Sequence, residues 1–291
     1  MPAEPPACLE TLRRHGFTFD KAKGQNFLVN PGVCPRMALL CGADPSSGVL
    51  EIGPGAGVLT RALAEVAGKV VAVELDARLL PVLDETLAGF DNVTVVQGDI
   101  LALDLPALLD THFGGMPVHV CANLPYYITS PIVMRLLEAS RRPCRPMASL
   151  PFVNITVMVQ KEAAQRLCAP MATRACGAIT AAVRYYAEPR LLFNVARGSF
   201  YPVPNVDSAV LQLTPRPSPP VEVADEAAFF RLVRAAFGQR RKTAANAVSA
   251  GPSVEKSLVQ AAMERAGIAP NARAENITLE EYARLAGELG L

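Results

Sequence analysis

A glycine-rich segment and two acidic residues form the first group whose types and spacing could bind a ligand. The segment Gly53-Pro-Gly55-Ala-Gly57 follows a short apolar run, and Glu74 and Asp99 follow the next two apolar runs. Glycine lets the backbone approach a ligand closely, and a helix N-terminus after such a loop favours negative charge. A carboxylate in the position of Glu74 can accept hydrogen bonds from a ribose diol, and one in the position of Asp99 can accept from an exocyclic amine. In register on three successive strands, these residues predict a nucleoside site.

The same segment indicates which nucleoside. Position 58 is a valine where a dinucleotide-binding fingerprint has its third glycine, so NAD is disfavoured. The loop carries no lysine to hold a phosphate. S-adenosylmethionine, which has a ribose, an adenine and a cationic sulfonium but no phosphate, fits better. The stretch 74–110 holds eight acidic residues and one basic residue, which also suits a cationic ligand.

Asn123-Leu124-Pro125-Tyr126 ends a fourth apolar run and could carry the chemistry. The amine of adenine is a poor nucleophile because its lone pair is delocalised into the ring. The side-chain oxygen of Asn123 and the carbonyl of Leu124 or Pro125 could accept its N–H groups and aim the lone pair at a methyl carbon. Tyr126 offers a face on which an unpaired base can stack. A plain turn, with Asn and Pro fixing the bend, is the alternative reading of this segment taken alone.

Alternating strands and helices must position these residues. The predicted strands cover 49–52, 69–75, 93–97, 118–122 and 155–159, with β-like runs at 178–186 and 208–213; the predicted helices cover 58–67, 79–88, 131–140 and 161–168. This alternation predicts an α/β fold with a doubly wound, Rossmann-like, mostly parallel sheet. Four prolines in 214–220 mark a linker, after which helical periodicity predicts a small all-α domain. We therefore expect a flexible leader over 1–16, a nucleoside-binding domain over 17–216 and a helical domain over 222–291.

Composition narrows the class of protein. Half of the 291 residues are apolar (51%), which is enough for a sizeable core, yet no apolar run approaches the length of a membrane span. The seven cysteines are scattered without a Cys-x-x-Cys pair, and there are only three histidines. Neither a disulfide scaffold nor a metal site is expected, and a reducing cytoplasm fits best. The start of the chain lacks the pattern of a signal peptide. Nothing in the sequence demands more than a monomer.

Charge is balanced overall but segregated along the chain. The formal net charge is +1, which argues against a bulk electrostatic binder of nucleic acid. However, residues 135–174 hold seven bases against two acids, and residues 227–254 hold five bases and no acid. If the fold placed these two segments on one face, they would present a basic surface to phosphates. Solvated helix faces are the alternative explanation.

The chain resembles the ribosomal RNA adenine N6-dimethyltransferases, and most closely the small-subunit enzymes among them. The resemblance spans residues 24–276 and is carried by short motifs: Gly24-Gln-Asn-Phe-Leu28, Glu51-Ile-Gly-Pro-Gly55, Glu74-Leu-Asp76, Asp99, Asn123-Leu-Pro-Tyr126, Gln160-Lys-Glu162, Phe200-Tyr-Pro-Val-Pro-Asn-Val-Asp-Ser208, Gln239-Arg-Arg-Lys-Thr243 and Arg273-Ala-Glu-Asn276. It implies a class I methyltransferase sheet, S-adenosylmethionine as methyl donor and no metal. The implied substrate is a pair of adjacent adenosines in a hairpin loop near the 3′ end of 16S rRNA, in the immature small subunit.

The resemblance also implies roles for individual residues. It assigns to the methyl donor Gln25, Asn26, Leu28, Glu51, Gly53, Gly55, Glu74, Leu75, Asp99, Ile100 and Asn123. It assigns to the reaction Asn123, Leu124, Pro125, Tyr126 and Phe200, with Phe200 packing on the target adenine opposite Tyr126. Arg240, Arg241 and Lys242 would dock RNA from the helical domain. The chain departs from the family pattern at Lys23, at 175–177 and in extra residues near 150–154, which affects only the leader and the RNA-facing loops.

Three other functions stay open. The related large-subunit methyltransferases that confer macrolide resistance share the donor loop, but the Gln239-to-Thr243 and Arg273-to-Asn276 segments favour the small-subunit type. A non-catalytic nucleic-acid binder on the same scaffold would not need Glu74, Asp99 and Asn123. An NAD-dependent dehydrogenase is opposed by Val58 and by the lack of a histidine at a strand end.

Overall fold

The computed structural model describes residues 7–19, 25–140, 151–239, 241–250 and 255–291. Arg240, together with residues 1–6 of the expected leader and residue 150 of the extra segment, lies outside these ranges. The chain divides into two compact units, one formed by Met1–Ala164 and Arg190–Pro215, the other by Gln165–Pro189 and Arg216–Leu291. The third passage between the units falls between Pro215 and Arg216, inside the proline-rich segment.

The main sheet has seven strands in the order β4-β3-β2-β5-β6-β9-β7. Their bounds are β2 Gly48–Ile52, β3 Lys69–Glu74, β4 Val93–Gln97, β5 Val118–Asn123, β6 Ile155–Gln160, β7 Ala187–Val195 and β9 Ser208–Pro215. Strands β2 to β6 pair in parallel, whereas β9 runs antiparallel to β6. The predicted doubly wound α/β sheet is confirmed. Its topological switch lies between β2 and β5, where ligands bind beyond the carboxyl ends of the strands.

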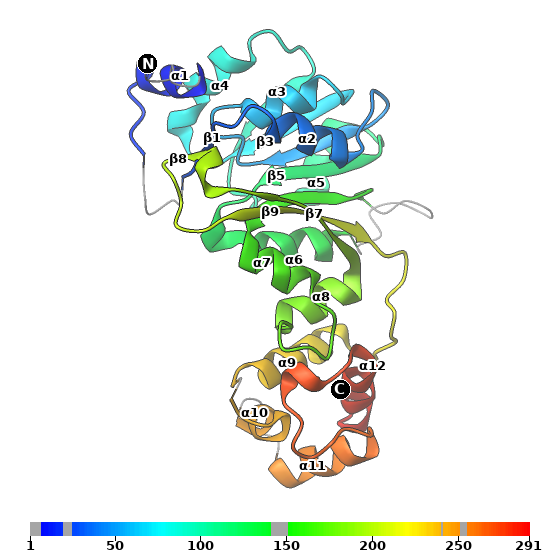
Figure 1. Ribbon diagram of the computed structural model, residues 1–291. Helices are drawn as coiled ribbons and strands as arrows, with labels where there is room; N and C mark the ends of the chain where they lie inside the picture. The colour runs from blue at the N-terminus through cyan, green and yellow to red at the C-terminus, as the bar shows by residue number, and fades with distance from the viewer. Residues whose placement is uncertain (1–6, 20–24, 141–150, 240, 251–254) are drawn as a thin grey trace. The chain divides into compact units, whose positions relative to one another are not determined.

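Helices in the first unit cover both faces of the sheet (Figure 1), with α2 and α3 over one face and α6 over the other. The first unit contains α2 Val33–Cys41, α3 Val58–Ala64, α4 Leu80–Leu87, α5 Leu105–Phe113 and α6 Thr129–Ala139, and α7 Lys161–Cys168 follows β6 directly. Met37, Leu63 and Val70 are among the fully buried side chains of the core between α2, α3 and the sheet. Because both faces are covered, β2 and β3 are near-continuous apolar runs rather than alternating ones.

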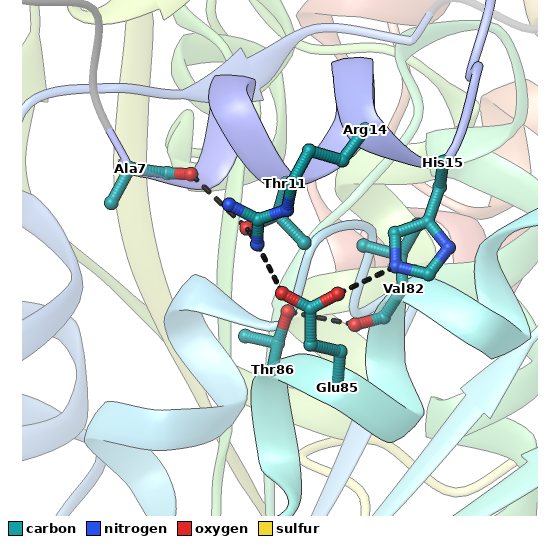
Figure 2. Close-up of polar contacts among 7 residues, drawn as sticks. All are labelled: Ala7, Thr11, Arg14, His15, Val82, Glu85 and Thr86. Carbon is teal, nitrogen blue, oxygen red and sulfur yellow. Dashed lines mark hydrogen bonds and ion pairs between the residues drawn. The ribbon is translucent and has the colours of Figure 1, made fainter.

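Helix α1 (Ala7–Arg14) forms where the sequence predicted a loose leader. Leu9 and Leu12 are buried in a small apolar cluster with Phe27, Leu79 and Val82, so burial of one apolar face stabilises this short helix. Figure 2 shows the polar part of the same contact, in which Arg14 and His15 both reach Glu85 on α4. The distance from His15 Nε2 to Glu85 Oε2 is 2.7 Å. The chain then forms strand β1 (Phe27–Leu28), which pairs antiparallel with β8 (Phe200–Tyr201).

The second unit is built around helices. They are α8 Ala178–Tyr186, α9 Glu226–Phe237, α10 Ala244–Ala250, α11 Lys256–Arg265 and α12 Leu279–Glu288. The predicted small all-α C-terminal domain corresponds to α9–α12. Thr278 and Glu281 form a capping box at the start of α12, with hydrogen bonds of 3.2 and 2.7 Å. Residues 165–189, which the sequence analysis placed with the nucleoside-binding domain, belong to this helical unit.

The prediction of a β-like run over 178–186 is wrong, because this segment is helix α8. Six of its nine residues are buried, and its apolar residues at 179, 182, 183 and 186 recur at helical spacing, a pattern that the strand prediction overlooked. Tyr185 and Tyr186 pack against Phe230 with ring centroids 5.1 and 5.4 Å apart, and the Tyr186 hydroxyl donates to Glu226 at 2.6 Å. Among the described residues, no helix is long and apolar enough to span a bilayer.

Candidate methyl-transfer site

A cavity opens in the first unit at the carboxyl ends of the parallel strands. Of the residues assigned to the donor and the reaction, those that line it are Gln25, Asn26, Leu28, Glu51, Gly53, Gly55, Glu74, Leu75, Asp99, Ile100, Asn123, Leu124, Pro125 and Tyr126. Phe200 is the one residue of that set that does not line it. The cavity also has apolar walls that the sequence did not single out, including Cys34, Met37, Ile132 and Met158.

The glycine loop between β2 and α3 forms part of the cavity wall. Gly53 and Gly55 have φ values of 68° and 59°, in the left-handed region that favours glycine. A Cβ on Gly55 would lie 3.2 Å from the ring of Phe27, whereas one on Gly53 would meet no atom within 4 Å. Gly53 therefore needs glycine for its backbone conformation, and Gly55 needs it for the close passage of Phe27 as well.

Glu74 connects the end of β3 to this loop. Its Oε2 accepts a hydrogen bond from the Gly55 N–H at 3.3 Å, and its Oε1 accepts from the Asp76 N–H at 2.8 Å. Burial raises the pKa of Glu74, while the backbone N–H groups of Asp76 and Gly55 oppose that rise. The carboxylate is thus held rigidly at the cavity wall, which is what recognition of a ribose diol requires.

Asp76 ties the N-terminal segment to the same wall. Its carboxylate accepts from the Gln25 amide at 3.0 Å and from the Arg78 guanidinium at 2.9 and 2.5 Å. Gln25 and Asn26 line the cavity immediately before β1. This segment therefore lies at the cavity together with Glu74. The family resemblance assigns the same segment to binding of the methyl donor.

Asp99 stabilises the turn after β4 and also faces the cavity. Its Oδ1 accepts from the Leu101 N–H at 2.9 Å, as expected for an acid that starts a turn after a strand. Asp99 is also half-buried and lines the cavity beside Ile100. A carboxylate has about four lone-pair sites, so the turn leaves it able to accept from an exocyclic amine.

Glu51 is the most deeply buried acid of the cavity wall. It is 1% exposed, and its Oε2 has no hydrogen-bond partner among the described residues. Burial, together with the negative charge of Glu74, raises the pKa of Glu51 to about 8. A buried acceptor without a partner is costly, so this oxygen fits a ligand that brings a donor or a positive charge. S-adenosylmethionine carries both.

Asn123 ends β5, and Tyr126 begins a short 3₁₀ turn (Tyr126–Ile128) before α6. The Leu124 N–H donates to the Met158 carbonyl at 3.0 Å, which fixes the segment against β6. The Pro125 carbonyl accepts from the Ile128 N–H at 3.3 Å and from the Thr129 hydroxyl at 3.1 Å. Both lone pairs of the Pro125 oxygen are therefore in use.

Two aromatic residues assigned to the target have different environments. The Tyr126 hydroxyl lies 2.7 Å from the hydroxyl of Ser208, a fully buried residue at the start of β9. Phe200 is 1% exposed and packs in the hydrophobic core on β8. The structure thus brings Tyr126 to the cavity and places Phe200 outside it, because the β1–β8 pair turns the Phe200 ring toward the core. Sequence reasoning gave Ser208 no role, although it ends the quoted Phe200-to-Ser208 motif.

The basic residues assigned to RNA docking belong to the second unit. Arg241 and Lys242 are exposed in the turn between α9 and α10, where the Lys242 N–H donates to the Gln239 carbonyl at 2.9 Å. The described residues contain no group of three or more His, Cys, Asp or Glu side chains placed to hold a metal ion.

Comparison with known proteins identifies the family. The family model described as "Ribosomal RNA adenine dimethylase" matches residues 16–290. The chain belongs to this family. A protein of Shouchella clausii (strain KSM-K16) named "Ribosomal RNA small subunit methyltransferase A" is 44% identical over 291 residues, covering 99% of this chain and 95% of that protein. A protein of the same name from Lachnoclostridium phytofermentans is 43% identical, covering 97% of this chain and 96% of its own length.

Solved structures agree with this dimethylase fold. A dimethyladenosine transferase from Plasmodium falciparum has a TM-score of 0.72 and 26% identity, covering 91% of this chain and 97% of its own. The 23S rRNA methyltransferase ErmE has a TM-score of 0.66 and 29% identity, covering 91% of this chain and 100% of its own. The predicted class I methyltransferase fold and the predicted family are both confirmed. This dimethylase is therefore a ribosomal RNA adenine methyltransferase.

Proposed function

We propose that this dimethylase uses S-adenosylmethionine to dimethylate N6 of two adjacent adenosines in a hairpin loop near the 3′ end of 16S rRNA. It acts on the immature small subunit, as a monomer, in the cytoplasm. The observation that carries the proposal is one cavity lined by Glu74, Asp99 and Asn123, which lie at the carboxyl ends of β3, β4 and β5. A nucleic-acid binder without catalysis would not need this set, and the full-length relatives at 43–44% identity are named small-subunit enzymes.

The residues of the cavity fit the methyl donor. Glu74 would accept from the ribose hydroxyls, Asp99 from the adenine amine and Glu51 from the positively charged end of the donor. When bound, S-adenosylmethionine supplies an electrophilic methyl group. Gln25, Asn26 and Leu28 would cover it from the N-terminal segment, which excludes water from the reacting groups.

The target amine would be held by the Asn123 side chain and one backbone carbonyl. Because the Pro125 oxygen already accepts two hydrogen bonds, the Leu124 carbonyl is the better second acceptor. Two acceptors on the N–H groups draw the amine toward tetrahedral geometry and direct its lone pair into the cavity. The Tyr126 ring would stack on the extruded base. No strong base is required, since the amine loses its proton readily after it is methylated.

The experiment incubates the protein with labelled S-adenosylmethionine and under-methylated small or large ribosomal subunits in parallel, followed by nucleoside mass spectrometry. We expect N6,N6-dimethyladenosine in small-subunit RNA alone. Label confined to the large subunit would transfer the assignment to the 23S type, which ErmE represents. Binding without label in either subunit would favour the non-catalytic binder.

Asn123→Ala provides the matched test of mechanism. It should abolish transfer while subunit binding stays close to that of the unchanged protein, because the side chain acts on the target amine. Turnover retained by this variant would remove the amide from the mechanism.

A further inference from the structure

A second cavity in the first unit has a polar lining that the methyl-transfer site does not use. Helix α2 contributes to both cavities, with Cys34 and Met37 at the first and Val33 and Arg36 at the second. The other wall of the second cavity comes from the end of β7 and the segment before β8, including Phe193 and Ser199. The two cavities are thus neighbours separated by the first turns of one helix.

Arg36 is the charged residue of this cavity, and its orientation is fixed. Its guanidinium carbon lies 4.0 Å from the centroid of the Phe193 ring, which is a cation–π contact. Stacking occupies the flat face of the guanidinium and leaves its N–H edges free to point outward. Arg36 is exposed, and within the described ranges no carboxylate lies at ion-pair distance from it.

The wall opposite Arg36 is rigid and offers hydrogen-bond donors. The Asn30 amide donates to the Ser199 hydroxyl oxygen at 3.1 Å, and the Asn30 side-chain oxygen accepts from the Gly32 N–H at 3.0 Å. The Ser199 carbonyl accepts from the Val29 N–H at 2.8 Å, which ties the wall to β1. Because the Ser199 oxygen is the acceptor from Asn30, its own O–H can donate into the cavity. The exposed amide of Asn194 adds donors at the rim.

The charge around this cavity has one sign. Residues 25–43 and 190–206, which supply its walls, contain Arg36, Arg190 and Arg197 and no acidic residue. The nearest acids in sequence are Glu188, five residues before Phe193, and Asp44 and Asp207, each eight residues beyond the lining. Asp207 accepts from the Arg197 backbone N–H at 2.9 Å. A stacked guanidinium, hydroxyl and amide donors, and no lining carboxylate are the chemistry of a site for a phosphate group.

We propose that this cavity binds a backbone phosphate of the substrate RNA, with Arg36 as its anchor. The inference rests on the proposed function in one respect: it takes the phosphate-bearing ligand to be ribosomal RNA. Because α2 lines both cavities, an RNA strand held here would pass close to the methyl-donor cavity. The contact would therefore help to align the target strand, in addition to the contacts made by the docking residues of the second unit. The modest net charge of +1 is consistent with binding through a few placed phosphate contacts rather than bulk attraction.

The test compares three variants in binding to under-methylated small subunits over a range of salt concentrations. Arg36→Ala removes the anchor, and Arg36→Lys keeps the charge but loses the flat stacking face. Arg61→Ala is the matched control, because Arg61 is also an exposed helical arginine over a phenylalanine, with 5.9 Å from its guanidinium carbon to the Phe90 centroid, yet it does not line the cavity. Melting curves and donor titration check that each variant folds and binds S-adenosylmethionine.

Arg36→Ala should weaken subunit binding roughly three- to tenfold and reduce the slope of log K against log salt by about 0.7–0.9, the value for one lost phosphate contact. Arg36→Lys should restore most of the slope, and Arg61→Ala should leave it unchanged. An unchanged slope for Arg36→Ala, or an equal change for Arg61→Ala, would overturn the inference. If the unchanged protein methylates neither subunit but still binds RNA through Arg36, the proposed function fails and this inference stands.

Discussion

Glu74→Gln tests whether the carboxylate that joins β3 to the glycine loop also binds the methyl donor. In the native protein each carboxylate oxygen accepts one backbone N–H, from Gly55 and from Asp76. Glutamine keeps the shape but has a single oxygen, so its NH₂ group must face one of these two N–H donors. Loss of one hydrogen bond to a charged acceptor costs about 1.5–3 kcal/mol. Part of this cost is offset, because burial already destabilises the charged carboxylate, as the raised pKa of Glu74 indicates. The neutral amide of glutamine avoids that penalty. The free energy of unfolding should therefore fall by roughly 1–2 kcal/mol.

The substitution should also weaken binding of the methyl donor, beyond any effect of reduced stability. A carboxylate can accept from both hydroxyls of a ribose diol, whereas glutamine accepts from only one. One charge-assisted hydrogen bond corresponds to about 10- to 100-fold in affinity. Isothermal titration with S-adenosylhomocysteine, the reaction product, measures this without turnover. Glu65→Gln is the control, since Glu65 is an exposed acid at the end of α3 outside the cavity. Affinity of folded Glu74→Gln within about threefold of the unchanged protein would refute the reasoning.

Four further variants test other residues of the site and the proposed RNA-docking residues. The pKa of Glu51 is about 8 in the folded chain and near its ordinary value of 4.5 once unfolded. The native state then binds more protons between these values, so stability should fall with rising pH by up to about 1.4 kcal/mol per unit in that window. Glu51→Gln should remove this slope in urea unfolding measured from pH 5 to 8, and a slope that persists would assign it to other groups. Ser208→Ala should lower kcat severalfold with little change in KM for the donor, because it releases the Tyr126 hydroxyl 2.7 Å away. Tyr126→Phe should add little to that loss, and fully additive losses would contradict a shared role. Replacing Arg241 and Lys242 together by alanine should weaken subunit binding and reduce its salt slope by about 1.4–1.8; an unchanged slope would place RNA docking elsewhere.

The sequence by itself indicated that Glu74 and Asp99 would lie together at one edge of the sheet, where both now line the cavity. Glu74 and Asp99 follow apolar runs that are separated by helical segments, and such an alternation builds a parallel sheet. In a parallel sheet every strand ends at the same edge, so residues 25 positions apart in the chain meet there without any further information. For the same local reason the bounds of the five parallel strands β2 to β6 were predictable to within one or two residues. No periodic pattern predicts that the N-terminal segment 25–28 lies at the cavity. Its position there was expected only from the family resemblance.

Only the tertiary structure decided how the target side is arranged. Tyr126 meets Ser208 across 82 positions, and Phe200 turns into the core because β8 pairs with the distant strand β1. Helix α1 has only eight residues and is stabilised by burying Leu9 and Leu12 against other segments, so its local sequence alone did not predict an ordered helix. The apolar residues of α8, in contrast, recur at helical spacing and could have predicted that helix. The cavity beside Arg36 joins two segments about 160 residues apart. Contacts of this kind depend on how finished elements pack, and the spacing of residues along the chain does not encode them directly.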